Sequence, residues 1–188
     1  MRIISGTFKG KKILEPKDIK TRPLKDLTKE SIFNILNHSN KFKIDLEDSN
    51  ILDLFSGVGS FGIECLSRGV KSVIFIENYN GVLPVLKKNL QNLKAIENYK
   101  IIEKDINNGK IFETLDKKFD IVFMDPPYKD KNLNLLLQNL ENIKILNKNG
   151  IVVIHRHKNE QDMIPKNFRA IEEKRYGLSK IIFLSLLN

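Results

Sequence analysis

Short apolar runs alternate with stripes of helical spacing from residue 50 onward. Runs rich in Ile, Val, Leu and Phe predict buried strands at residues 51–55, 73–76, 100–103, 119–124 and 151–154. Between them, apolar residues at helical spacing predict helices over 60–68, 83–93, 111–115 and 133–140. Strands that alternate with helices form a parallel sheet covered on both faces. The pattern therefore predicts a doubly wound α/β domain.

The N-terminal segment has a looser pattern. Residues 2–14 alternate between apolar and polar positions and are interrupted by Gly6 and Gly10, which predicts an extended, basic hairpin with Phe8 near its turn. We expect this hairpin to lie outside the core. Asp26 is expected to be the N-cap of a helix, because a buried stripe follows it at Thr28, Ile32, Ile35 and Leu36.

The C-terminal segment predicts a second hairpin. Residues 168–175 and 180–187 are extended runs separated by a turn at 176–179. Added to one edge of the sheet, they give a mostly parallel, seven-stranded sheet with an antiparallel addition. No linker or repeat interrupts the chain, so we expect a single domain over 1–188, with a hairpin extension at 1–24 and a Rossmann-like core at 25–188.

The composition is that of an ordinary globular protein, with 188 residues, 41% of them hydrophobic and 29% charged. The chain has no apolar run of 18 or more residues, and its first residues lack the apolar core of a signal peptide. We therefore expect a cytoplasmic protein without a membrane partner. The single cysteine, Cys65, excludes an intramolecular disulfide and a cysteine-based zinc cluster.

The net charge of +9 favours an anionic partner, although a general bias toward lysine would give the same total. The distribution of the charge is more informative than the total. Basic residues gather in the N-terminal segment, at Lys9, Lys11, Lys12, Lys17, Lys20, Arg22, Lys25 and Lys29. A basic segment of this kind is suited to contacts with nucleic-acid phosphates, and the alternative is an ordinary solvated surface.

A polar tetrad follows the predicted strand at 119–124 and consists of Asp125, Pro126, Pro127 and Tyr128. Ligands of parallel sheets bind beyond the carboxyl ends of the strands, where this tetrad begins. The prolines stiffen the turn, so the Asp125 carboxylate and the Pro126 carbonyl project as acceptors beside the Tyr128 ring. An exocyclic amine on a planar base fits this arrangement. The alternative is an Asp-Pro turn that only ends the strand.

A glycine-rich turn joins the first predicted strand to the first helix of the core, and it contains Gly57, Gly59 and Gly62. Glu77 and Asp105 end the next two strands, where carboxylates can accept ribose hydroxyls and an adenine amino group. Together these features predict an adenosine site. The residues assigned to the cofactor are Asp53, Phe55, Ser56, Gly57, Gly59, Glu77, Asp105, Ile106 and Asp125.

Two cofactors fit an adenosine site of this shape. A nicotinamide dinucleotide would place its pyrophosphate at the helix N-terminus, but Asp53 and Glu64 bracket the turn with negative charge. S-adenosylmethionine carries a sulfonium and an ammonium group and has no phosphate. The acidic turn therefore favours S-adenosylmethionine.

The chain resembles class I methyltransferases, and more narrowly the bacterial RsmD-type family, which methylates the N2 amine of a guanine in small-subunit (16S) ribosomal RNA. The tetrad is shared with many amine methyltransferases, and its combination with the N-terminal block is more specific. The matching segments are Met1-Arg2-Ile3-Ile4-Ser5-Gly6, Phe8-Lys9-Gly10, Arg22-Pro23, Lys29-Glu30, Phe33-Asn34, the glycine turn, the tetrad and Tyr176-Gly177.

The resemblance implies that the tetrad holds the target amine and that the glycine turn, Glu77 and Asp105 hold the cofactor. The expected partner is ribosomal RNA, free or within an assembling small subunit, bound by a monomer without a metal ion. Its contacts are predicted at Arg2, Lys9, Lys11, Lys12 and Arg22. The chain departs from the family pattern around Leu24, Leu27 and His155, where the family usually has Thr, Arg-Val and an acidic residue.

Other functions fit parts of the sequence. A DNA adenine or cytosine N-methyltransferase shares the tetrad, but the chain has little room for a domain that reads DNA sequence. A methyltransferase acting on protein glutamine amides and a ribosome-assembly factor without catalysis are further alternatives. His155 and His157 could suggest a metal site, but no third ligand stands out, so we interpret His155 as part of a basic strand end that faces RNA.

Overall fold

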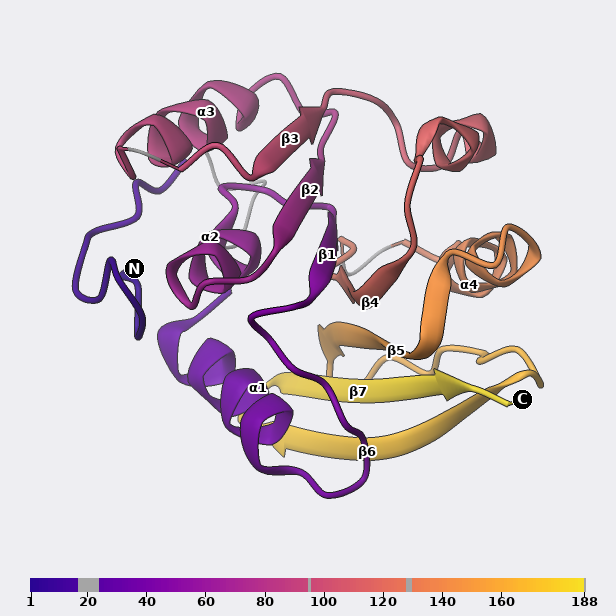
Figure 1. The fold of residues 1–188 in the computed structure, drawn as a ribbon. Coiled ribbons are helices and arrows are strands. Elements are labelled where there is room, and N and C mark those ends of the chain that lie inside the picture. The colour runs from indigo at the N-terminus through magenta and orange to yellow at the C-terminus, as the bar shows by residue number, and fades with distance from the viewer. Residues whose placement is uncertain (17–23, 95, 128–129, 188) are drawn as a thin grey trace.

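A computed structural model describes residues 1–16, 24–94, 96–127 and 130–187, and it contains one seven-stranded sheet. Its order is β3-β2-β1-β4-β5-β7-β6 (Figure 1). Strands β1 to β5 are parallel, and β7 pairs antiparallel with both β5 and β6. The strands are β1 Asn50–Leu54, β2 Ser72–Ile76, β3 Tyr99–Ile102, β4 Phe119–Met124, β5 Leu146–His157, β6 Phe168–Tyr176 and β7 Ser179–Leu186. The predicted fold class is confirmed.

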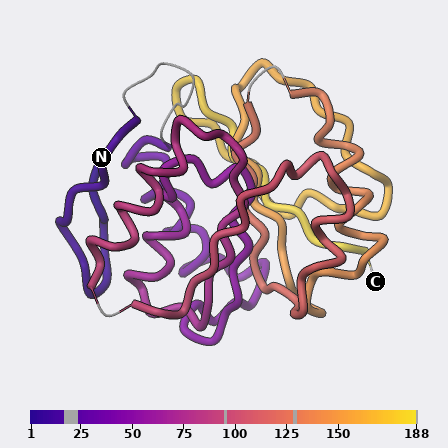
Figure 2. The backbone as a smooth tube through the Cα atoms, turned by 90° about the horizontal axis from the view of Figure 1, so that it is seen from above, coloured from indigo at the N-terminus to yellow at the C-terminus, as the bar shows by residue number. Residues whose placement is uncertain are grey.

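Helices cover both faces of the sheet (Figures 1 and 2). One face carries α1 Asp26–His38, α2 Ser60–Ser67 and α3 Leu83–Gln91, and the other carries the 3-10 helix η1 Gly109–Thr114 and α4 Leu133–Asn142. Each layer has its own apolar core. In the first layer, stacked rings join α1, α2 and β4, with centroids 5.3 Å apart for Phe33 and Phe61 and 4.0 Å apart for Phe61 and Phe123.

The alternation of side chains along the strands decides which polar groups share a face. Ile51, Phe75, Phe123 and Val153 belong to the core on the α1–α3 side. Because side chains two residues apart on a strand point to the same face, Asp53, Glu77, Asp125 and His155 continue that side of the sheet. The sheet therefore directs these four groups to its α1–α3 side, near the carboxyl ends of the strands.

The N-terminal segment is part of the core, so the prediction that it lies outside the core was wrong. Ile3 and Ile13 are only 1% and 2% exposed and belong to the same apolar cluster as Phe33 and Phe61. An isolated antiparallel bridge between Arg2 and Lys12 holds the two arms together. The loose alternation in this segment thus places one set of side chains against the domain.

Several boundaries differ from the predictions, and for two of them the structure shows the cause. Asp26 is the first residue of α1 and makes no capping bond, because its carboxylate accepts the Arg2 N–H at 3.3 Å instead. β5 begins at Leu146, before the predicted residue 151, because Leu146 pairs with Phe119 ahead of a register shift. The polar residues within that irregular stretch hid the beginning of the strand. Across the described ranges, no helix is both long and apolar enough to cross a membrane.

Candidate active site

The glycine turn is held in a strained and well-bonded conformation between β1 and α2. Phe55 has a φ of 58°, in the left-handed region that residues with side chains rarely adopt. The Ser56 hydroxyl donates to the Asp53 carbonyl at 2.6 Å and to the Ile76 carbonyl at 3.2 Å. Gly59, with a φ of 83°, is the N-cap of α2. These bonds bring the backbone of the turn to the carboxyl end of the sheet.

Asp53 lies beneath this turn and is only 1% exposed. Its Oδ2 accepts the Gly62 N–H at 3.0 Å, and a Cβ at Gly62 would lie 2.9 Å from that oxygen. Burial raises the pKa of Asp53 well above its ordinary value; the Gly62 N–H opposes the shift, and the nearby Asp125 and Glu77 carboxylates reinforce it. The sheet therefore gathers three predicted site acids in one electrostatic environment, and a cation would relieve their repulsion.

The raised pKa of Asp53 predicts a pH-dependent stability. A carboxyl whose pKa is raised by folding contributes stability at low pH, and that contribution is lost as the pH rises through the folded-state value. Asp53→Asn cannot ionise and keeps an oxygen for the Gly62 N–H. We expect the free energy of unfolding of the variant, relative to the wild type, to increase by about 1.4 kcal/mol per pH unit. This increase applies between the pKa of Asp53 in the unfolded state and its higher pKa in the folded state. Urea unfolding without cofactor, followed from acid to alkaline pH, measures this, and a constant difference would contradict it.

Glu77 connects the end of β2 to the glycine turn. Its Oε2 accepts the Gly57 N–H at 2.8 Å, and its Oε1 accepts the N–H groups of Asn78 and Tyr79, each at 2.9 Å. The side chain is half-buried, so it keeps an accessible side. Each carboxylate oxygen can accept more than one hydrogen bond, so Glu77 can hold the turn and a ligand together.

The two residues predicted after β3 lie in different environments. Asp105 is exposed, and its Oδ1 accepts both the backbone N–H of Asn107 at 2.9 Å and the Asn107 side-chain amide at 3.1 Å. The Ile106 side chain is only 4% exposed and packs in the core on the α4 side. Their assignment to an adenine remains a prediction, in which Ile106 would contribute its backbone.

The described part of the tetrad begins at Asp125, whose side chain is 20% exposed. Pro126 is buried and Pro127 is exposed. Tyr128 lies outside the described residues. The Pro127 carbonyl accepts the Asp130 N–H at 2.8 Å, which ties the two described residues on either side together after β4.

Arg156 fixes Pro127 and Asp130 from the end of β5, and it was not among the residues predicted from the sequence. Its guanidinium is 1% exposed, donates to the Pro127 carbonyl at 3.2 Å and the Asp130 carbonyl at 3.0 Å, and pairs with both oxygens of Asp162 at 2.8 and 3.0 Å. A buried arginine needs such partners. The signal available in the sequence was an arginine placed two residues after the apolar run 151–154.

His155 is buried, so the interpretation that it belongs to an exposed strand end was wrong. It is only 6% exposed, its Nδ1 lies 2.8 Å from Asp125 Oδ1, and its Nε2 lies 2.8 Å from Ser179 Oγ. The antiparallel pairing of β5 with β7 encloses the ring, which the apolar and basic pattern of β5 did not reveal. Within the ranges that the structure describes, no cluster of three or more His, Cys, Asp or Glu could hold a metal ion.

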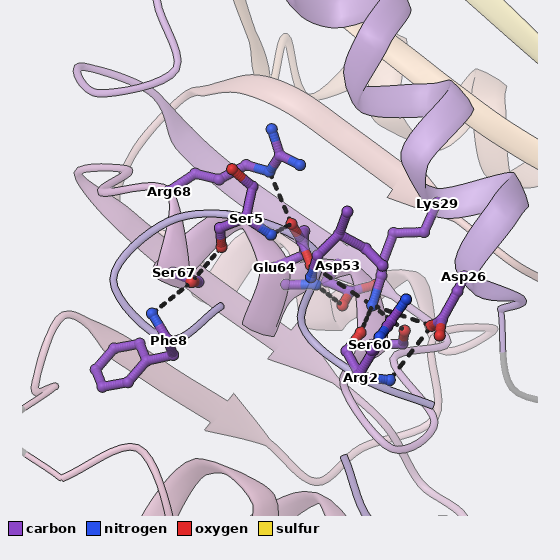
Figure 3. Close-up of polar contacts among 12 residues, drawn as sticks. Arg2, Ser5, Phe8, Asp26, Lys29, Asp53, Ser60, Glu64, Ser67 and Arg68 are labelled. Carbon is purple, nitrogen blue, oxygen red and sulfur yellow. Dashed lines mark hydrogen bonds and ion pairs between the residues drawn. The ribbon is translucent and has the colours of Figure 1, made fainter. Parts of the chain in front are cut away.

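Glu64 anchors the N-terminal segment and does not bracket the turn as predicted (Figure 3). Its carboxylate is fully buried, accepts the N–H groups of Ile4 and Ser5 at 2.7 and 2.9 Å, and pairs with Arg68 at 2.9 Å and Lys29 at 3.6 Å. The Glu64 carboxylate thus binds the N-terminal segment to α2 and is neutralised by Arg68 and Lys29. The acidity of the cofactor region comes from the strand-end acids instead.

The predicted RNA contacts lie along the length of α2. The Arg2 carbonyl accepts from Lys29, whose Nζ also lies 3.4 Å from Ser60 Oγ at the N-terminus of α2. The turn that carries Lys9 is bonded to Ser67 at the other end of the helix, through the Thr7 and Phe8 N–H groups. The bridge between Arg2 and Lys12 therefore lies beside the N-terminal end of α2, and the turn at Lys9 lies beside its C-terminal end, about 10 Å further along the helix. Lys11 directly precedes Lys12. Arg22 lies outside the described residues.

The sheet order, the antiparallel β7 and the acids around the glycine turn define the class I methyltransferase fold. The solved structure of yhhF from Escherichia coli, provisionally described as a methyltransferase, superposes with a TM-score of 0.80 at 29% identity and covers 99% of this chain and 97% of its own. The family described as "Conserved hypothetical protein 95" matches residues 1–185. The chain belongs to this family.

Curated relatives of the chain carry a functional name. "Ribosomal RNA small subunit methyltransferase D" of Haemophilus influenzae is 32% identical over 183 residues, which are 95% of this chain and 90% of that protein. The protein of the same name from Escherichia coli K12 is 30% identical over 181 residues, which are 94% of this chain and 85% of that protein. The similarity thus extends over nearly the full length of this chain and over most of each relative.

Proposed function

We propose that this protein transfers a methyl group from S-adenosylmethionine to the exocyclic N2 amine of a guanine in small-subunit ribosomal RNA. The observation that carries the proposal is the gathering of Asp53, Glu77 and Asp125 around a backbone turn at the carboxyl end of the sheet. The names of the relatives support ribosomal RNA as the substrate. The tetrad supports an amine as the group that reacts.

The donor set fits a cationic cofactor. In this proposal Glu77, which already accepts the Gly57 N–H, also accepts the ribose hydroxyls. The acidic environment around Asp53 favours an ammonium and a sulfonium group over a pyrophosphate. When bound, the cofactor supplies an electrophilic methyl carbon. The guanine N2 lone pair forms the new nitrogen–carbon bond, the electrons of the broken sulfur–carbon bond stay on sulfur, and the amine then loses one proton to water.

Asp125 orients the amine and stabilises the positive charge that develops on its nitrogen. The Pro126 carbonyl is proposed to accept the second amine hydrogen. Arg156 keeps the backbone of this turn in place through the Pro127 carbonyl. The base must leave its stack to reach the site, and the Tyr128 ring is proposed to replace the lost stacking.

Mapping the modified nucleoside tests the function directly. Purified protein, S-adenosylmethionine and 16S RNA from cells that lack the gene should yield N2-methylguanosine at one position by mass spectrometry. Naked RNA and isolated small subunits are compared as substrates. A methylated adenine or cytosine in DNA, or methylated protein glutamine, would support the alternative enzymes, and absence of transfer with cofactor bound would support an assembly factor.

Removing the ribose acceptor should weaken cofactor binding. We expect Glu77→Ala to reduce the affinity for S-adenosylmethionine by about 1.5 to 3 kcal/mol, because it removes a charged hydrogen-bond partner and releases the Gly57 N–H. Calorimetry without added metal measures the change. Glu103→Ala is the matched control, since Glu103 lies just past β3 and pairs with Lys87 at 2.7 Å. Preference of the wild type for a nicotinamide dinucleotide would overturn the cofactor assignment.

Neutralising the basic hairpin should weaken RNA binding and its dependence on salt. Log affinity falls as log salt rises. We expect replacement of Lys9, Lys11 and Lys12 by Gln to make this slope less steep by about 0.7 to 0.9 per lost phosphate contact. Cofactor affinity should stay unchanged. The control replaces three exposed lysines outside the hairpin, namely Lys118, Lys148 and Lys166. Equal slopes for the two triple variants would show that RNA docks elsewhere.

A further inference from the structure

The Asp125 carboxylate is hydrogen-bonded to the buried side chain of His155. The His155 side chain is 8% exposed and the Asp125 side chain 20%, so the pair lies at the border between the core and the site. Its second partner, Ser179, begins β7, and the pairing of His157 with Ser179 fixes the position of that residue beside β5. Asp125, His155 and Ser179 thus form a chain of hydrogen bonds across three strands that ends at the tetrad.

The donor and acceptor of each hydrogen bond in this series follow from the chemistry of the groups at its two ends. An ionised carboxylate only accepts hydrogen bonds, so His155 Nδ1 carries a hydrogen and donates it to Asp125 Oδ1. In a neutral ring Nε2 is then an acceptor, and the Ser179 hydroxyl donates to it at 2.8 Å. Among the described residues, this arrangement occupies Oδ1 and leaves Oδ2 of Asp125 for another donor.

We propose that His155 is a positioning residue for methyl transfer, a role that rests on the proposed function of the site. By holding Oδ1, the ring fixes the rotation of the Asp125 carboxylate, so that Oδ2 stays directed at the amine. The backbone is secured separately, because Arg156 binds the Pro127 and Asp130 carbonyls. The specific contribution of His155 is therefore the orientation of one side chain. Misplacing a reacting group by about 1 Å can reduce a rate by about 100-fold.

Two substitutions separate this role from a structural one. His155→Asn retains a donor at the position of Nδ1, whereas His155→Leu fills similar space without a donor. We expect single-turnover methyl transfer to 16S RNA to fall by about 10- to 100-fold in His155→Leu, and His155→Asn to recover most of the rate. The affinity for S-adenosylmethionine should stay unchanged in both. Equal rates for the Leu variant and the wild type, or equal losses in the Leu and Asn variants with matched thermal stability, would overturn the inference.

A second measurement does not depend on activity. Nitrogen NMR of the histidine rings distinguishes the two neutral tautomers, and His155→Asn identifies the signals of this ring. We expect the Nδ1–H tautomer for His155, with a change of its Nδ1 signal in Asp125→Asn. The Nε2–H tautomer would overturn the proposed positioning even if the wild type methylates RNA. Conversely, a wild type that shows the Nδ1–H tautomer but transfers no methyl group to any RNA would locate the failure in the proposed function.

Discussion

Asp125→Asn should reduce single-turnover methyl transfer by about 100-fold or more, the scale observed when one preorganised partner of a transition state is removed. The substitution keeps the shape of the side chain. Its remaining oxygen can still accept from His155 Nδ1, which turns the new amide nitrogen toward the substrate. A donor would then face the N–H that the site should receive, and the charge that stabilises the developing cation would be missing.

The controls for this prediction lie within the same loop. Asp130→Asn makes the same chemical change five residues further on, where the carboxylate accepts the Asn132 N–H at 2.7 Å, and it should leave the rate nearly unchanged. Cofactor affinity should survive largely intact in both variants, because Glu77 and the glycine turn remain and Asp125 is only one of the residues assigned to the cofactor. Methyl transfer by Asp125→Asn at the wild-type rate, with saturating cofactor and RNA, would remove Asp125 from the mechanism.

Much of the fold could be predicted because its elements are encoded locally. The apolar run 119–124 and the leucine stripe of α4 each need only a few neighbouring residues to specify their structure. The strand-end position of Glu77 and Asp125 followed from the same patterns, since each residue comes directly after a short apolar run, whereas Asp53 lies within β1, one residue before its end. Their juxtaposition across neighbouring strands then follows from the geometry of a parallel sheet.

The contacts that the sequence did not reveal join residues far apart in the chain. His155 meets Asp125 and Ser179 only after β5 pairs with β4 on one side and β7 on the other. Glu64 meets the backbone of residues some 60 positions earlier. From their polarity alone, these side chains would be expected to face solvent or to bind a ligand. Their burial depends on long-range pairing that no local pattern encodes.

Glu64→Ala should destabilise the protein by about 3 to 5 kcal/mol, because it removes one partner of a buried ionic network. The loss leaves the Ile4 and Ser5 N–H groups without their acceptor and Lys29 without its nearest buried anion (Figure 3). Burial already lowers the pKa of Lys29, against the raising effect of Glu64 and Asp26. Without Glu64, the variant must bury that lysine with less compensation.

The pH dependence identifies the cause of this loss. A lysine whose pKa is lowered by folding contributes stability that is present above its unfolded value and lost as the pH falls through the folded one. The deficit of Glu64→Ala should therefore shrink as the pH rises toward 10.5, the ordinary value for lysine. Urea unfolding at several pH values measures it, and Glu103→Ala, which breaks the exposed pair with Lys87, should cost no more than about 1 kcal/mol. Equal losses in the two variants would show that Glu64 does not hold the N-terminal segment onto α2.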